Sequence, residues 1–191
     1  VRFLSDRTSV VDLGCGDGVF IELFRQMYPR KKIIGVDTND ELIALARQAN
    51  QPDSIVQADA CAFIRENAAL FDGFVMTDVI EHLDVGEVTQ ILQAIPSGAR
   101  VYIRTPNTNS LLGHQFFLQE PTHKAAYCPL VLQRLLARAG FDILASGERD
   151  GILSFGSLFG WVRRKILQAL FINEFSRLFG GGNYFVFAQK K

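Results

Sequence analysis

The sequence predicts one α/β domain in which a mainly parallel sheet lies between two layers of helices. Predicted strands and helices alternate five times between residues 9 and 105, the pattern of parallel strands joined by crossover helices. The first predicted strand ends in a glycine-rich turn, which is typical of an open α/β sheet. With 191 residues, 48% of them hydrophobic, the chain can bury one substantial core. We therefore expect a single domain over residues 1–191.

The first unit consists of a strand over residues 10–13, a turn containing Gly14, Gly16 and Gly18, and a helix. Apolar residues recur at helical spacing after the glycines, and Pro29 is expected to end the helix. The apolar stripe of this helix is predicted to be Val19, Phe20, Leu23, Phe24 and Met27.

The later elements follow the same alternation. Thr38, with Glu41 three residues later, predicts a capping box, and the helix after it has an expected apolar stripe. Pro129 suits the first turn of a further helix, and Gly140 suits its C-terminal cap. The stripe after Thr38 is Leu42, Leu45, Ala46 and Ala49. Strands are expected at 32–36, 54–58, 71–77, 100–105, 141–145 and 184–188, and helical segments near 60–64 and 88–95.

Charge and hydropathy exclude several classes of protein. Twenty basic and twenty acidic residues cancel, so no global attraction to nucleic acid or acidic lipid is expected. No secretory signal opens the chain, and the best candidate for a membrane span, residues 151–170, is interrupted by a basic trio at 163–165. Because Val1 lies so close to the first strand, we expect that further sequence precedes it.

The cysteines predict the redox environment. Cys15, Cys61 and Cys128 are odd in number and far apart, which favours reduced thiols over a disulfide framework. We therefore expect a reducing compartment, the cytoplasm.

The alternate glycines at 14, 16 and 18 predict a loop where a cofactor lies against bare main chain at a helix N-terminus. Asp37 ends the second strand, where a carboxylate can accept hydrogen bonds from two vicinal ribose hydroxyls. It would also be ordinary there as a solvated acid before a helix. A dinucleotide fingerprint would have a glycine where Val19 stands, so the spacing favours a cofactor without a pyrophosphate.

Four segments, Val10–Gly18, Ile33–Asp37, Gln57–Ala60 and Asp78–Leu83, together resemble the motifs of class I S-adenosylmethionine-dependent methyltransferases. Glu-His-Leu followed by Arg-Thr-Pro-Asn, Pro-Thr-His-Lys and Ala-Gly-Phe is similar to the branch containing quinone-biosynthesis enzymes and many methyltransferases of glycan, lipid and natural-product gene clusters. The resemblance covers residues 8–145. It implies a Rossmann-like three-layer sandwich, a seven-stranded sheet with an antiparallel last strand, and S-adenosylmethionine as cofactor.

The resemblance also implies where each part of the cofactor lies. The methionine end would lie on the first loop, the ribose on Asp37, the adenine on Asp59, and the methyl-donor cleft beside Asp78. Asp59 would equally suit a helix cap. The expected cofactor set is Asp12, Gly14, Cys15, Gly16, Asp37, Thr38, Asp59, Ala60, Asp78 and Val79.

Methyl transfer from a sulfonium mainly requires that donor and acceptor are held in line and that water is excluded. A general base is needed only for an acceptor that arrives protonated. His82, just past the fourth strand, is the first candidate, and His123 is the second. Either histidine could instead bind substrate or order a loop.

Asp78, Glu81 and His82 have the spacing of one side of a helical turn, and His123 could complete a set of metal ligands. This set resembles the metal cluster of small-RNA 2′-O-methyltransferases. Most relatives with Glu-His-Leu are not known to use metal, and the chain lacks a basic RNA-binding stretch. We therefore expect no metal and no nucleic-acid partner.

Residues 152–181 form an expected apolar helical insert between the sixth and seventh strands, with the basic trio at its centre. Such a segment suits a membrane-interface anchor, a lid over an apolar acceptor, a dimer face at 152–179 or a helix packed on the sheet.

These observations predict an S-adenosylmethionine-dependent methyltransferase that acts, at oxygen, on a small-molecule or lipid- or glycan-linked acceptor. The expected location is the cytoplasm, with a peripheral position at the membrane as the alternative. One alternative is a catalytically inactive cofactor-binding subunit of a larger assembly. Two others are a nicotinamide oxidoreductase and a metal-dependent RNA 2′-O-methyltransferase.

Overall fold

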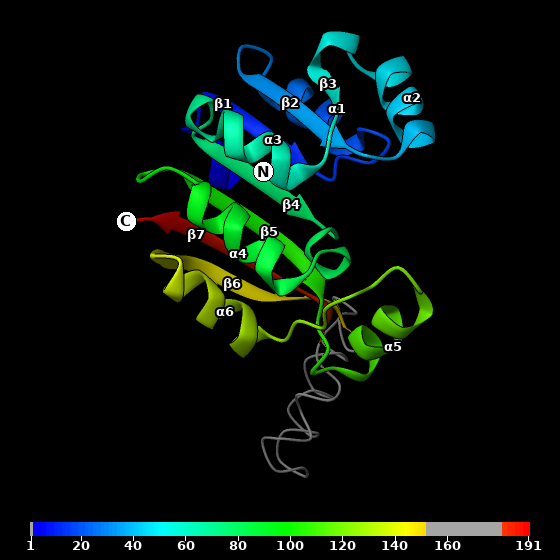
Figure 1. The fold of residues 1–191 in the computed structure, drawn as a ribbon, viewed down its shortest axis with the longest axis vertical. Helices are drawn as coiled ribbons and strands as arrows, with labels where there is room; N and C mark the ends of the chain where they lie inside the picture. The colour runs from blue at the N-terminus through cyan, green and yellow to red at the C-terminus, as the bar shows by residue number, and fades with distance from the viewer. Residues whose placement is uncertain (1, 152–180) are drawn as a thin grey trace, which may run out of the picture.

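The computed structural model describes residues 2–151 and 181–191. Its centre is a seven-stranded sheet (Figure 1). The strands are β1 (Ser9–Leu13), β2 (Lys32–Asp37), β3 (Ile55–Gln57), β4 (Gly73–Thr77), β5 (Arg100–Pro106), β6 (Phe141–Gly151) and β7 (Gly181–Lys190). The α-helices are α1 (Val19–Met27), α2 (Asp40–Ala49), α3 (Ala60–Asn67), α4 (Val85–Ala94), α5 (Leu111–Gln119) and α6 (Pro129–Arg138). Short 3-10 turns are η1 (Arg2–Leu4), η2 (Pro52–Ser54), η3 (Ala68–Leu70) and η4 (Ile80–His82).

The strand order is β3-β2-β1-β4-β5-β7-β6. β7 pairs antiparallel with both of its neighbours, β5 and β6, and the other neighbouring strands are parallel. This topology confirms the predicted α/β class, a mainly parallel seven-stranded sheet with an antiparallel last strand. Because the order reverses between β1 and β4, loops at the carboxyl ends of these strands diverge and leave room for a ligand.

Two hydrophobic clusters hold the helices to the two faces of the sheet. On one face, α3, α4 and α6 pack through residues such as Ile64, Ile91 and Leu132, and Figure 1 shows these three helices in front of the strands. On the other face, α1 and α2 pack through Phe24 and Ile43. The molecule is therefore the expected three-layer sandwich.

The predicted stripe of α1 is mostly wrong. Phe24 is buried, but Val19, Leu23 and Met27 are 53%, 49% and 50% exposed, and the sheet is met by Ile21 instead. Residues spaced by three or four share a helix face, but several such faces of α1 are apolar, and spacing alone does not say which one meets the sheet.

The predicted start of α2 is wrong by one residue. Asn39, not Thr38, caps the helix, because its Oδ1 accepts from the backbone N–H groups of Glu41 and Leu42. The buried stripe of this helix is Ile43 and Ala46, while Leu45 is 51% exposed. An asparagine side chain reaches these two amides as well as a threonine hydroxyl would.

In the C-terminal half, two strands are longer than predicted and one helix was not predicted. β6 and β7 are longer than the predicted strands at 141–145 and 184–188, and α5 has no counterpart among the predicted helices. Pro129 lies in the first turn of α6, as predicted. The apolar insert predicted at 152–181 lies, apart from its last residue, outside the described residues. Within residues 2–151 and 181–191, no helix has the length and apolar character needed to span a bilayer.

Candidate active site

A cleft of about 920 Å³ lies over the carboxyl ends of β1, β2 and β4. The loops that surround it are far apart in the sequence, yet all ten residues expected to hold the cofactor line it. These residues are Asp12, Gly14, Cys15, Gly16, Asp37, Thr38, Asp59, Ala60, Asp78 and Val79.

The loop after β1 depends on glycine at position 14. Gly14 has φ +71°, and a Cβ added there would lie 2.4 Å from Cγ2 of Val79. Its N–H and that of Cys15 both donate to the carbonyl of Val36, at 2.8 and 3.1 Å. The main chain of β1 is thereby turned tightly against the end of β2, and it forms the floor of the cleft.

Asp37 connects this loop to the end of β2. Its Oδ2 accepts from the N–H of Gly16 at 2.8 Å, and its Oδ1 accepts from the N–H of Asn39 at 2.9 Å. The carboxylate is thus fixed at the rim of the cleft, half-buried, by two backbone donors. Asp37 is therefore held by the loop after β1, unlike a solvated acid that only precedes a helix.

Asp12 is the most deeply buried acid of the cleft. Its side chain is 2% exposed, and Oδ1 has no hydrogen-bond partner among the described residues. Burial, with the charge of Asp37 nearby, raises the pKa of Asp12 well above its ordinary value. Burial also raises the pKa of the neighbouring Cys15 thiol to about 12, so this thiol is protonated and unreactive at neutral pH. An unpartnered buried carboxylate oxygen lining a cleft calls for a donor from a ligand.

The structure gives Asp59 a capping role. Its Oδ1 accepts from the N–H of Ala62 at 2.8 Å, at the start of α3. Asp59 and Ala60 nevertheless line the cleft beside Asp37. The side chain therefore has a structural partner and also faces the space where a ligand would lie.

Asp78 does not join the set of metal ligands considered from the sequence. Among the described residues it is the non-glycine residue with positive φ, +53°, and its carboxylate accepts two hydrogen bonds from the guanidinium of Arg104 on β5. The spacing argument assumed one helical turn over residues 78–82, whereas the turn η4 begins only at Ile80. Asp78 is therefore turned toward Arg104, at the edge of the cleft.

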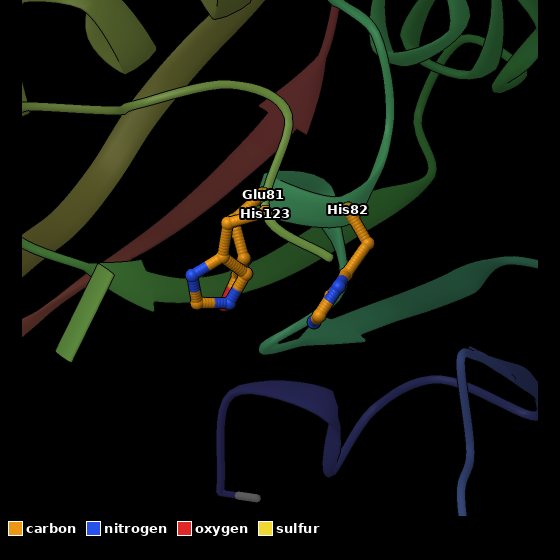
Figure 2. Close-up of side chains that lie close together, drawn as sticks. All are labelled: Glu81, His82 and His123. Atoms are coloured by element: carbon orange, nitrogen blue, oxygen red, sulfur yellow. The ribbon is translucent and has the colours of Figure 1, made fainter. Parts of the chain in front are cut away.

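The other three residues of that set do come together. Figure 2 shows Glu81, His82 and His123 side by side, the first two from η4 and the third from the loop between α5 and α6. One ligand atom of each lies within 4.8 Å of those of the others, and the two imidazole rings have centroids 4.6 Å apart. His82 lines the cleft directly.

Glu81 is buried, with 1% exposure, and its Oε2 accepts from the hydroxyl of Thr105 at 2.9 Å. Burial raises the pKa of Glu81 to about 7. Burial and the neighbouring His123 lower the pKa of His82, which favours the neutral imidazole. Both shifts favour the uncharged form of the group.

Sequence reasoning missed the side chains that complete this end of the cleft. Arg104, Thr122 and Lys124 line it together with His82. Arg104 follows from the alternation along β5, but the place of Thr122 and Lys124 is set by a loop between α5 and α6 that no local pattern specifies. Asn107, at the end of β5, does not line the cleft: it is fully buried and donates to Glu148 and to the carbonyl of Gly181.

The chain is similar to known proteins both in sequence and in structure. The family model described as "Methyltransferase domain" matches residues 2–146. Two curated trans-aconitate 2-methyltransferases are similar to the chain. The one from Azoarcus sp. (strain BH72) is 29% identical over 125 residues, 64% of this chain and 49% of the relative. The one from Methylobacterium nodulans is 28% identical over 158 residues, 80% of this chain and 55% of the relative. The chain thus spans about half the length of these relatives.

Solved structures share the fold. A SAM-dependent methyltransferase from Archaeoglobus fulgidus superposes with a TM-score of 0.80 at 24% identity, over 99% of this chain and 89% of that chain. The PH0226 protein from Pyrococcus horikoshii OT3 gives 0.67 at 16% identity, over 100% and 85% of the chains. Because the family model matches residues 2–146 of 191, the chain belongs to the methyltransferase domain family, which confirms the class I S-adenosylmethionine-dependent methyltransferase that its motifs resemble.

Proposed function

We propose that this protein transfers the methyl group of S-adenosylmethionine to an oxygen atom of a small-molecule acceptor. The observation that carries the proposal is the continuous cleft. At one end it has acids and bare main chain at the ends of β1 and β2, and at the other it has His82, Arg104 and Lys124. The first end suits a cationic nucleoside donor, and the second suits an oxygen acceptor.

The chemistry of the residues present fits S-adenosylmethionine. Its ammonium group is a donor of the kind that the unpartnered Oδ1 of Asp12 lacks. Asp37 offers a fixed carboxylate of the kind that binds two vicinal ribose hydroxyls, and Asp59 offers an acceptor for the adenine amino group. Gly14 leaves bare main chain at the floor of the cleft, which a donor can approach closely. A side chain at this position would also collide with Val79.

The proposed mechanism is an in-line displacement. S-adenosylmethionine, when bound, supplies an electrophilic methyl carbon. The protein then has three tasks: to align the acceptor oxygen with that carbon, to exclude water, and to accommodate loss of the acceptor proton. His82 and His123 are the groups available to take up that proton.

The acceptor class is suggested by charge and by similarity. Arg104 and Lys124 favour an anionic acceptor, although each also has an acidic partner, Asp78 and Glu87 respectively. The curated relatives are named for trans-aconitate, a small polycarboxylate. We therefore rank a small carboxylic acid first and a lipid- or glycan-linked hydroxyl second.

Methyl transfer is tested with S-adenosylmethionine labelled in the methyl carbon. The purified chain is incubated with trans-aconitate, with a small dihydroxy aromatic compound and with a lipid-linked hydroxyl compound, and labelled products are identified by mass spectrometry. The proposal predicts labelled oxygen ester or ether in at least one arm. Binding of S-adenosylmethionine with no transfer in any arm would instead support the cofactor-binding subunit.

A further inference from the structure

We propose that Glu81, His82 and His123 bind one divalent transition-metal cation, and that this cation holds the acceptor oxygen. The first half concerns binding alone. The second half rests on the proposed function. The sequence alone favours a metal-free site, whereas the structure brings these three side chains together (Figure 2).

The ligand atoms are already close enough to share one ion. One atom from each side chain lies within 4.8 Å of the other two, a separation that a single ion with bonds of about 2.0–2.2 Å can bridge after small side-chain rotations. They come from two different chain segments. One carboxylate and two imidazoles match the preference of first-row divalent metals for nitrogen with oxygen. Three protein ligands leave positions open for water or for a substrate oxygen.

The hydrogen bonds of His82 fix the nitrogen that it presents. Its Nδ1 lies 2.8 Å from the hydroxyl oxygen of Thr122. That hydroxyl donates its own proton to Oε1 of Glu120, so toward His82 it can only accept. Nδ1 of His82 must therefore carry the proton, and Nε2 keeps the lone pair that a metal needs.

His123 is fixed in the same tautomer by a different partner. Its Nδ1 lies 2.8 Å from the backbone carbonyl oxygen of Phe117, which can only accept. The ring also stacks on the Phe117 side chain, with centroids 5.1 Å apart. In both imidazoles Nδ1 is thus engaged with an acceptor, and Nε2 is the nitrogen left to bind a metal, the arrangement in which protein histidines bind metals.

The third ligand is anchored by its own segment. The backbone carbonyl of Glu81 accepts from the N–H groups of Lys124 and Ala125, at 2.7 and 3.1 Å, which ties η4 to the loop that carries His123. The carboxyl is buried and accepts a hydrogen bond from Thr105, beside the imidazoles of His82 and His123. A buried carboxylate without a cation is costly, and a bound divalent ion removes that cost.

Metal binding gives the acceptor end a definite chemistry. An acceptor O–H that ligates the cation loses its proton to water more readily than it would in solution. The oxygen then forms a bond to the methyl carbon, and the carbon–sulfur bond breaks with its electron pair on sulfur. In this scheme His82 and His123 are metal ligands, and neither acts as a general base.

Binding is tested on the untagged chain after chelator treatment, with Co²⁺ as the probe. Calorimetry measures stoichiometry and affinity, and visible absorption reports the nitrogen ligands. We expect one Co²⁺ per chain. Glu81→Gln and His123→Ala are expected to lower the affinity by at least about tenfold. His114→Ala is the matched control, because His114 is the exposed third histidine of the chain and lies outside the cluster. This variant should bind as tightly as the natural sequence.

A second variant, Thr122→Val, keeps the test valid if a ligand substitution prevents folding. It keeps the size of the side chain, leaves all three ligands in place and removes the acceptor for Nδ1 of His82. We expect the affinity for Co²⁺ to fall by about 10 to 100-fold, with unchanged affinity for S-adenosylmethionine. Equal Co²⁺ affinity in the natural chain, His123→Ala and His114→Ala would overturn the site.

The activity assay separates the two proposals. Methyl transfer that stops with chelator and returns with Mn²⁺ or Co²⁺ supports the catalytic half. Transfer at the same rate with and without chelator rejects that half and leaves the methyltransferase proposal intact. Tight metal binding to the cluster without transfer to any acceptor retains the site and rejects the proposed function.

Discussion

At the scale of single residues, the cleft gathers acids whose roles differ. Asp12 is buried and lacks a partner for one oxygen, Asp37 is fixed by backbone donors, and Asp59 already caps α3. The sequence predicts that these acids lie at the carboxyl ends of strands. It does not predict their hydrogen bonds, because the partners come from distant segments or depend on which of two adjacent residues caps a helix.

Asp12→Asn tests the buried acid. The substitution keeps the shape of the side chain and removes its charge, so we expect the affinity for S-adenosylmethionine to fall by about tenfold or more, equivalent to about 1.4 kcal/mol. Calorimetric titration measures the change. An unchanged affinity would mean that the unpartnered oxygen does not face the ammonium group.

The same variant predicts a pH effect on stability. Burial raises the pKa of Asp12 in the folded chain well above its ordinary value of 3.8. The folded state therefore holds this proton more tightly, and this carboxyl lowers stability progressively as pH rises from about 4 toward its folded-state pKa. Asp12→Asn removes that loss. The variant should gain unfolding free energy relative to the natural chain between about pH 4 and pH 7, measured by urea unfolding. A constant difference over this range would contradict the assignment.

Two substitutions of Asp59 separate its capping of α3 from its proposed contact with the adenine. Asparagine caps helices as well as aspartate does, whereas alanine does not. We expect Asp59→Ala to lower the unfolding free energy by about 1 kcal/mol and Asp59→Asn to leave it nearly unchanged. Both should weaken S-adenosylmethionine binding if the carboxylate meets the adenine. Normal binding by Asp59→Asn would leave only the capping role.

At the scale of elements, the loop between β1 and α1 positions the rest of the cleft. Its alternate glycines could be predicted to form a cofactor loop, and their spacing excluded a dinucleotide fingerprint. The buried faces of α1 and α2 could not be predicted, because more than one set of residues at helical spacing is apolar. The place of the loop carrying Thr122 and His123 could not be predicted for another reason: it is fixed by backbone hydrogen bonds to the carbonyl of Glu81, which is distant in the sequence.

Gly14→Ala tests the close approach in this loop. The new Cβ would meet Val79 at 2.4 Å, in a backbone conformation with φ +71°. Gly98→Ala is the control for backbone strain alone, since Gly98 has φ +81° with no atom within 4 Å of the added Cβ. We expect Gly98→Ala to cost about 1–2 kcal/mol without affecting cofactor affinity, and Gly14→Ala to cost more and to weaken binding. Chemical unfolding and calorimetry provide both numbers. Equal effects of the two substitutions would show that the space beside Val79 is not limiting.

At the scale of the whole molecule, the sheet order and the three layers are the part that the sequence predicted best. Alternating strands and helices leave few topologies, and the antiparallel β7 came from the family resemblance rather than from the pattern. The last three strands are joined by a buried polar contact that the pattern does not reveal: Nδ2 of Asn107 donates to Glu148 on β6 and to the carbonyl of Gly181 on β7.

Asn107→Ala tests this contact. Loss of the two hydrogen bonds leaves Glu148 and the Gly181 carbonyl without this donor, so we expect the unfolding free energy to fall by about 1–3 kcal/mol. Because Asn107 is buried and does not line the cleft, cofactor affinity should stay within about twofold. Weaker cofactor binding with unchanged stability would contradict this structural role and indicate that Asn107 contacts the cofactor.

The central claim is that this cleft holds S-adenosylmethionine. The most direct measurement is a calorimetric titration of the chain with S-adenosylmethionine and, separately, with NAD⁺, repeated with Asp37→Ala. The account predicts one S-adenosylmethionine per chain, markedly weaker binding by the variant, and no heat from NAD⁺. Binding of NAD⁺ without binding of S-adenosylmethionine would contradict it.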